Sequence, residues 1–325
     1  IIPRLVFLFL IVVFFLILDF ERDFIFLIYL HTFSVLSALL FSSILNIKIT
    51  QNFKIQFQKS IFLKLFKFGA PLIISGIAIW GVNSFDKVIL RTTEQFDQLA
   101  LVSIAVTLGY GATFLSSIFN TIWTPLVYKW DAKGMNMKII SEIADYAILL
   151  MFLIIFLCIP ISWILPYLFP PFYAEIQYLV LGSLYGPFLY TLSEITGVGI
   201  ALKRKTEYYL IISTFSAVIS FLTAWFFVPI WGAKGAFTSI MIAYLSFFIL
   251  RTHISMKMLL GLNSLKFNIY AIFGFILISG YIYYGQLLPD FAYLFLLGIA
   301  LIAVKVNVNK IKKIVSTISE KEIFG

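Results

Sequence analysis

The chain has 325 residues, of which 62% are hydrophobic and 12% are charged, and its formal net charge is +9. A soluble domain carries about 25% charged residues, because water must wet its surface. The composition therefore excludes a soluble enzyme, a nucleic-acid-binding domain and a large extramembrane domain. The apolar runs are continuous, which excludes an outer-membrane barrel with alternating polar and apolar residues. We expect an all-α, polytopic helical membrane protein.

About ten apolar segments have the length of a transmembrane helix, which needs roughly 20 residues to cross a bilayer. The first follows Arg4 and lacks a small-residue cleavage site, so we interpret it as a retained span and not as a signal peptide. The chain begins with Ile1, and we expect upstream helices to be missing. In chain order, the predicted spans are 5–20, 24–45, 68–91, 99–126, 141–168, 176–202, 208–228, 235–250, 267–284 and 288–306.

Basic residues are unevenly distributed between alternate connections. Of the 24 Lys and Arg residues, 20 fall on the side that holds both predicted termini, whereas Arg22, Lys87, Arg91 and Lys234 fall on the other. Positive charge favours the cytoplasmic side, so we expect a multi-pass cell-membrane protein with both termini of this chain in the cytoplasm. The longest connection, 48–66, is predicted to be a basic cytoplasmic connector or an amphipathic helix at the membrane surface.

A polar stripe marks the third predicted span. Asn83, Asp86, Lys87, Arg91 and Glu94 fall within an arc of about 140° on a helix that advances roughly 100° per residue. The stripe is either a cavity wall with a coupling-ion site or a set of side chains that reach the outer interface.

The sixth predicted span carries Ser183, Tyr190 and Glu194 on one face. A carboxylate at this depth must be protonated, paired or exposed to water, so Glu194 either carries a coupling proton or pairs with a basic residue. Rows of hydroxyl groups on the fourth and seventh spans either hold helices together or line a hydrophilic path. Because four spans are polar on one side, we favour a cavity. The two rows are Ser103, Thr107, Tyr110, Ser117 and Thr124, and Tyr209, Ser213, Ser216, Ser220 and Thr223.

Motifs of enzymatic chemistry are missing from the sequence. It contains no phosphate-binding loop, no nucleophile elbow and no H-E-x-x-H pair. One cysteine, Cys158, and two distant histidines, His31 and His253, give no set of metal ligands. We therefore predict neither an enzyme nor a cofactor or metal site.

Three strings resemble landmarks in the C-terminal half of bacterial polysaccharide flippases, which belong to the multidrug/oligosaccharidyl-lipid/polysaccharide exporter superfamily. They are 67–75 with 83–90, then 199–206, then 228–237. The chain differs from many relatives at Lys87, where they have arginine, and at Trp225-Phe226-Phe227, where they have an asparagine before the Pro-x-x-Gly turn. Lysine keeps the charge of arginine but lacks its planar fork.

This resemblance implies a transporter of two six-helix lobes, of which the chain would hold the second. Residues 1–47 would be the last two helices of an incomplete first lobe, 48–66 the connector, 67–260 the second lobe, and 261–325 two trailing helices with a basic cytoplasmic tail. The implied activity is the flipping of undecaprenyl-diphosphate-linked oligosaccharide across the bacterial cytoplasmic membrane by alternating access. Such transport serves polysaccharide biosynthesis, including O-antigen of lipopolysaccharide and capsule.

The implied partners are the lipid-linked oligosaccharide, membrane lipids, and the glycan polymerase and chain-length machinery, with no nucleic acid. By their chemistry and position, Asp86 and Glu194 are candidates for ion coupling. Candidates for the substrate cavity are Asn83, Lys87, Arg91, Tyr110 and Tyr190. Alternatives are a cation-coupled drug exporter of the same superfamily, a membrane-embedded glycan polymerase or acyltransferase, and an inactive fragment.

Overall fold

Helices dominate the computed structural model of the chain. Within the described residues there is no strand, in agreement with the all-α expectation. The chain divides into two compact units, residues 1–62 and 63–325, and α2 (Phe24–Leu45) lies in the first. The structure describes residues 6, 9–10, 13–14, 24–45, 58–134, 138–259, 264–289, 291–299 and 302.

Six helices of the described residues are long and apolar enough to cross a membrane. They support a membrane protein, whereas the count of ten spans and the two-lobe architecture stay predictions. The predicted spans 5–20 and 288–306 lie partly outside the described residues. The six candidate spans are Ile25–Ile44, Lys59–Val82, Phe96–Ala132, Ile139–Ser162, Glu207–Leu259 and Leu265–Leu287.

The third predicted span, 68–91, is not one continuous helix. α4 (Lys59–Val82) starts earlier and takes up the end of the predicted connector, and α5 (Phe85–Thr92) follows after a turn. At the turn, Asn83 Nδ2 donates to the Ile79 carbonyl at 2.9 Å, so the side chain competes with the backbone and ends the helix. The polar stripe therefore does not lie on one continuous helix: Asp86, Lys87 and Arg91 lie on α5, whereas Asn83 and Glu94 lie in the turns before and after it.

The next helices are α6 (Phe96–Ala132) and α7 (Lys138–Ser162). The predicted span 141–168 ends earlier than expected, because the chain turns at Trp163 and Ile164 and continues as α8 (Leu165–Leu168). Pro160 lies in the last turn of α7. Pro166 lies in the first turn of α8, and a missing amide donor is tolerated in the first turn of a helix. A short 3₁₀ turn, η2 (Pro171–Tyr173), leads into the next helix.

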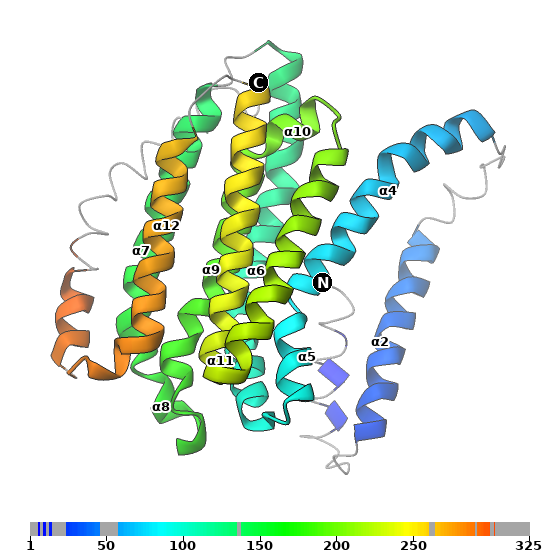
Figure 1. Cartoon of the computed structure of the whole chain (residues 1–325). Coiled ribbons are helices and arrows are strands. Elements are labelled where there is room, and N and C mark those ends of the chain that lie inside the picture. The colour runs from blue at the N-terminus through cyan, green and yellow to red at the C-terminus, as the bar shows by residue number, and fades with distance from the viewer. Residues whose placement is uncertain are drawn as a thin grey trace. The chain divides into compact units, whose positions relative to one another are not determined.

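The helix α9 (Ile176–Thr196) lies in the middle of the bundle, in contact with α6, α7, α11 and α12 (Figure 1). Gly182 and Gly186 are one turn apart, and added Cβ atoms there would come within 3.0 Å of Phe237 and 2.8 Å of Tyr244 on α11. Small residues at this spacing let two membrane helices approach closely. A short helix, α10 (Val198–Leu202), follows α9.

The long helix α11 (Glu207–Leu259) folds back on itself at Gly232, which has φ +53° and ψ −127°. Its two arms lie side by side, because Ser246 Oγ donates to Ser216 Oγ at 3.3 Å (Figure 1). The bend falls between the predicted spans 208–228 and 235–250, as the sequence suggested. The helix α12 (Leu265–Tyr284) and the 3₁₀ turn η3 (Gly285–Leu287) follow.

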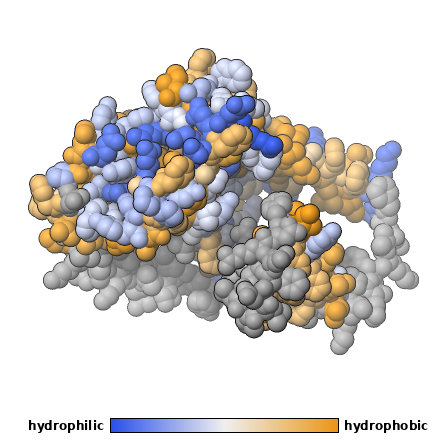
Figure 2. Space-filling view, turned by 90° about the horizontal axis from the view of Figure 1, so that it is seen from below, coloured by the Kyte–Doolittle hydropathy of each residue, from blue (hydrophilic) through white to orange (hydrophobic). Residues whose placement is uncertain are grey.

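Charged residues are sorted between the two ends of the bundle. α5 and the Gly232 bend lie at one end, and α10 lies at the other (Figure 1). The exposed side chains near α5 include Arg91, Glu94 and Asp97, and Figure 2 shows hydrophilic residues gathered at that end. Lys203, Arg204 and Lys205 are exposed beside α10. This separation agrees with the predicted charge asymmetry, and the assignment of the basic end to the cytoplasm stays a prediction.

The bend should depend on glycine at position 232. A Cβ atom there would lie 2.6 Å from Gln98 Oε1, which accepts a hydrogen bond from the Ala233 amide, and the positive φ disfavours any L side chain. We expect Gly232→Ala to lower the unfolding free energy by about 1–3 kcal/mol, measured as a reduced thermal midpoint in detergent. Gly111→Ala is the matched control, since a Cβ at Gly111 meets nothing within 4 Å. Equal midpoints for the two variants would contradict this account of the bend.

Candidate functional site

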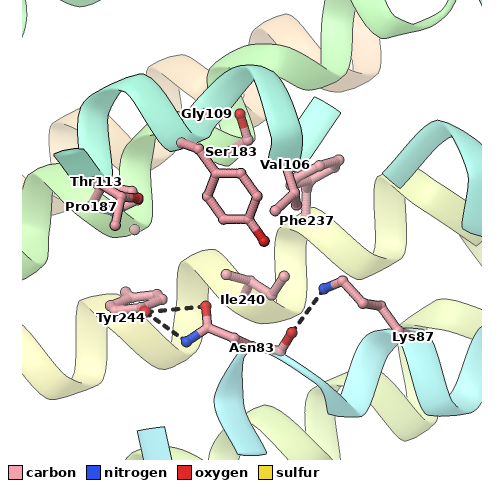
Figure 3. A pocket seen from close by; sticks show the side chains of 12 residues that line it. Asn83, Lys87, Val106, Gly109, Thr113, Ser183, Pro187, Phe237, Ile240 and Tyr244 are labelled. Atoms are coloured by element: carbon pink, nitrogen blue, oxygen red, sulfur yellow. Dashed lines mark hydrogen bonds between the residues drawn. The ribbon is translucent and has the colours of Figure 1, made fainter. Parts of the chain in front are cut away.

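A polar cavity of about 240 Å³ lies among α5, α6, α9 and α11, next to the break between α4 and α5. We call it the Lys87 cavity (Figure 3). Its walls combine one ammonium group, one amide and several hydroxyl groups with apolar side chains. The lining residues are Asn83, Lys87, Val106, Gly109, Tyr110, Thr113, Ser183, Gly186, Pro187, Phe237, Ile240 and Tyr244.

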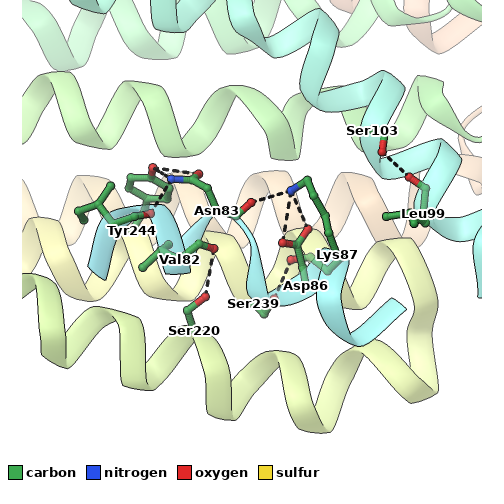
Figure 4. A network of polar contacts seen from close by, with 11 residues as sticks. Val82, Asn83, Asp86, Lys87, Leu99, Ser103, Ser220, Ser239 and Tyr244 are labelled. Carbon is green, nitrogen blue, oxygen red and sulfur yellow. Dashed lines mark hydrogen bonds and ion pairs between the residues drawn. The ribbon is translucent and has the colours of Figure 1, made fainter. Parts of the chain in front are cut away.

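The Lys87 ammonium is held in place by two neighbours. Its Nζ donates to the Asn83 carbonyl at 2.8 Å and lies 3.2 Å from Asp86 Oδ2 (Figure 4). Asp86 is buried, with 1% of its side chain exposed, whereas 31% of the Lys87 side chain is exposed. Asp86 also lies in the first turn of α5, where the helix dipole favours a negative charge. Asp86 therefore supports Lys87 from outside the cavity lining.

A second pair of side chains fixes the wall next to Lys87. The Tyr244 hydroxyl donates to Asn83 Oδ1 at 3.1 Å and accepts from Asn83 Nδ2 at 3.0 Å. This pair joins the turn after α4 to the second arm of α11 (Figure 3). Tyr244 fits there because Gly186 of α9 offers no side chain against its ring. The Asn83 side chain, whose amide ends α4, thus also lines the cavity.

The wall on the other side depends on close packing between α6 and α9. A Cβ atom at Gly109 would lie 2.6 Å from Ser183 Oγ, so only glycine lets the two helices approach this far. Tyr110, the next residue on α6, lines the cavity with 58% of its surface exposed. The tyrosine therefore provides an aromatic and hydroxyl surface at an accessible position.

A buried ion pair forms a separate polar cluster at the ends of α9 and α11, which we call the Arg251 cluster. Arg251 Nη1 donates to Glu194 Oε1 at 2.6 Å and to Ser193 Oγ at 3.0 Å. The guanidinium carbon also lies 4.9 Å from the centre of the Tyr209 ring and 5.6 Å from that of Phe247. Cation–π contacts of this kind help to offset the loss of water around a guanidinium.

The Arg251 cluster is tightly enclosed. Only 4% of the Arg251 side chain and 19% of the Glu194 side chain are exposed. Arg251 Nε has no hydrogen-bond partner among the described residues, and a Cβ at Gly197 would lie 2.5 Å from it. Tyr190 stacks on Phe247 with ring centres 6.0 Å apart. The cluster therefore binds α9 and α11 together through a charge pair with little access to water.

The seven predicted site residues fall into several places. Asn83, Lys87 and Tyr110 line one cavity, and Asp86 pairs with Lys87. Tyr190 and Glu194 belong to the Arg251 cluster. Arg91, near the end of α5, is exposed and is not one of the residues that line the Lys87 cavity.

Sequence reasoning missed two important residues. The predicted span ends at residue 250 and so places Arg251 in a cytoplasmic connection, whereas α11 continues to Leu259 and buries Arg251. The signal was available, because Ile254, Met256 and Met258 continue the apolar pattern beyond the arginine. Tyr244 gave no signal, since one tyrosine in an apolar helix does not identify its partner.

The two rows of hydroxyl groups differ in their surroundings. On α11, Ser216 contacts Ser246, and Ser220 donates to the Val82 carbonyl at 3.3 Å, so this row holds helices together (Figure 4). On α6, Ser103 and Thr107 are exposed and donate to backbone carbonyls of their own helix. The α6 row therefore leaves a polar strip on the surface of the bundle, and only its member Tyr110 lines the Lys87 cavity.

Within the described part of the chain, no group of three or more His, Cys, Asp and Glu side chains could hold a metal ion. The chain matches no family model, no curated protein and no solved structure.

The Arg251 cluster should behave as one unit. We expect Glu194→Gln and Arg251→Gln each to cost about 3–5 kcal/mol of unfolding free energy, because each leaves a buried partner unpaired. The double variant should lose less than the sum of the two, which a double-mutant cycle of thermal unfolding would measure.

Asp145→Asn is the control for this cycle. It breaks the pair between Lys266 and Asp145, whose side chains are 47% and 43% exposed, and should cost at most about 1 kcal/mol. Additive losses for Glu194 and Arg251, or losses no larger than that of the control, would contradict the role of the cluster.

Proposed function

We propose that the chain is a transporter, part of a flippase that moves undecaprenyl-diphosphate-linked oligosaccharide across the bacterial cytoplasmic membrane. The observation that carries this proposal is the Lys87 cavity, which places an ammonium group next to α6 and α11, two of the candidate spanning helices. Lys87 lies on α5 near one end of the bundle, with 31% of its side chain exposed, so its charge can attract an anion that enters the cavity from that end.

The chemistry of the Lys87 cavity suits the head group of such a lipid. The ammonium attracts a diphosphate, and the groups of Asn83, Tyr110 and Ser183 can exchange hydrogen bonds with a sugar or phosphate oxygen. Lysine acts as a point charge and lacks the bidentate fork of arginine. This weaker grip suits a transporter, because the diphosphate must be released after it is bound. Movement between inward and outward openings would then release the head group on the other side.

A second cavity supports a substrate that also has a hydrocarbon chain. It has about 210 Å³ and lies among α6, α7 and α9, on the other side of the contact between α6 and α9 from the Lys87 cavity. Its lining includes Phe119, Leu150, Met151, Ile154 and Phe188. A lipid with a charged head group and an apolar tail needs these two environments close to one another.

The alternatives fit the described residues less well. A drug exporter for organic cations would present acidic side chains, whereas the Lys87 cavity presents an ammonium and keeps Asp86 outside its lining. A glycan polymerase or acyltransferase would need a nucleophile or general base with an orienting partner. Glycan polymerase and chain-length machinery remain proposed partners of the transporter.

Removal of the charge at position 87 tests the proposal. In the native cell, with the protein at its natural full length, we expect Lys87→Gln to reduce surface glycan about tenfold, equivalent to about 1.4 kcal/mol of lost transition-state stabilisation, and to accumulate lipid-linked oligosaccharide. Lys87→Arg should keep most of the export because it keeps the charge.

Lys266→Gln is the matched control, since Lys266 is exposed and pairs only at the surface. All variants should be compared at equal protein level in the membrane. Normal glycan export by Lys87→Gln would contradict the proposal, as would equal losses in Lys87→Gln and Lys266→Gln.

A further inference from the structure

A third cavity, of about 270 Å³, lies at the end of the bundle where α8 and η3 are found. Its walls come from the turn after α7, the start of α9, and the segment that follows α12. Four aromatic rings and two carboxamides dominate the lining, and none of its residues carries a charge. We call it the aromatic cavity, and the residues used below are Trp163, Tyr167, Gln177, Tyr178, Gln286 and Tyr293.

The rings of the aromatic cavity are held by packing and by hydrogen bonds. Trp163 stacks on Tyr293, with ring centres 6.4 Å apart and planes 17° apart, and meets Tyr167 edge-on at 5.7 Å. Tyr293 donates to the Gly285 carbonyl at 3.4 Å. The end of α7 is fixed to α12 by the hydrogen bond between the Ser162 and Tyr281 hydroxyls, 2.6 Å long. The cavity wall is therefore preorganised.

The two carboxamides lie at different depths in this cavity. Gln177 is buried, with 6% of its surface exposed, and Gln286 is exposed at the rim. Gln177 is not among the buried side chains that lack a hydrogen-bond partner, so Gln286 is the carboxamide that is more open to a ligand. Each carboxamide offers two N–H donors and one carbonyl acceptor, a set that matches adjacent sugar hydroxyl groups.

Besides hydrogen-bonding groups, a carbohydrate site needs aromatic rings whose faces are exposed. Tyr167 is 75% exposed although it lines the cavity, and its neighbour Trp163 is half-buried. The C–H face of a pyranose ring is apolar and packs flat on an aromatic ring, while its hydroxyl groups point to the sides. Tryptophan and tyrosine are also common at the membrane interface, but an interfacial belt requires neither a hollow nor amide groups.

We infer that the aromatic cavity is a binding site for a neutral pyranose unit of a glycan. The uncharged lining favours a neutral sugar over an acidic one, because it offers no cation to a carboxylate or phosphate. The site lies at the end of the bundle opposite the basic cluster near α10, which is the predicted outer side (Figure 1). The idea that this site receives the transported glycan rests on the proposed function. The binding of a sugar at this site does not depend on that function.

Binding of soluble sugars tests this inference. The protein at its natural full length in lipid nanodiscs would be mixed with maltotriose, chitotriose or mannotriose at millimolar concentration. We expect saturation-transfer NMR to show transfer from the protein to the sugar C–H protons for at least one of the three. Gln286→Ala, at an exposed position, should keep the fold and weaken binding about five- to tenfold, the loss of one hydrogen bond. Trp163→Leu should abolish binding.

Tyr284→Ala is the matched control, because Tyr284 is 68% exposed in the same region but does not line the cavity. No transfer to any of the three sugars would overturn the inference, and so would equal transfer in the parent, Gln286→Ala and Trp163→Leu. Sugar binding together with normal export by Lys87→Gln would leave the site standing and refute the proposed transport. Loss of export by Lys87→Gln without sugar binding would refute the site alone.

Discussion

Close packing of α9 against its neighbours is the constraint on which the other features depend. Gly182 and Gly186 let the second arm of α11 approach α9, and Gly109 lets α6 approach it from another direction. The same helix then lines all three cavities, with Ser183 in the first, Phe188 in the second and Gln177 in the third. A central helix can carry polar groups in a membrane because its neighbours separate it from lipid. α9 is not among the six candidate spanning helices of the described residues.

Charges inside the bundle are tolerated because they occur in pairs. Asp86 and Lys87 are adjacent on α5, so their pair depends on one short helix, whereas Glu194 and Arg251 come from α9 and α11 and join two elements. The two kinds of ion pair have different effects on the movement of helices. A pair within one helix can travel with it, while a pair between helices resists their separation. In the proposed function Lys87 attracts the substrate, whereas Arg251 joins α9 to α11.

Apolar runs and turn signals were enough to predict the helical class, most helix positions and the reversal near Gly232. The composition of each segment decides whether it can enter a bilayer, and proline and glycine mark where it bends. The break at Asn83 was missed, since it depends on a side chain that donates to the Ile79 carbonyl. The aromatic cavity does not follow from the sequence either, because Tyr293 is more than 100 residues from Trp163 and Gln177 and meets them only after the bundle packs.

The central claim is that a lipid-linked oligosaccharide occupies the Lys87 cavity, and a photo-crosslinker at Tyr110 tests it most directly. Tyr110 lines the cavity and is exposed, whereas Tyr146 on α7 is exposed and does not line it. Benzoylphenylalanine would replace each residue in turn in the native cell, and the crosslinked lipid would be identified by mass spectrometry. The account predicts a lipid that carries diphosphate and sugar at position 110 and only phospholipid at position 146. Phospholipid alone at both positions would contradict it.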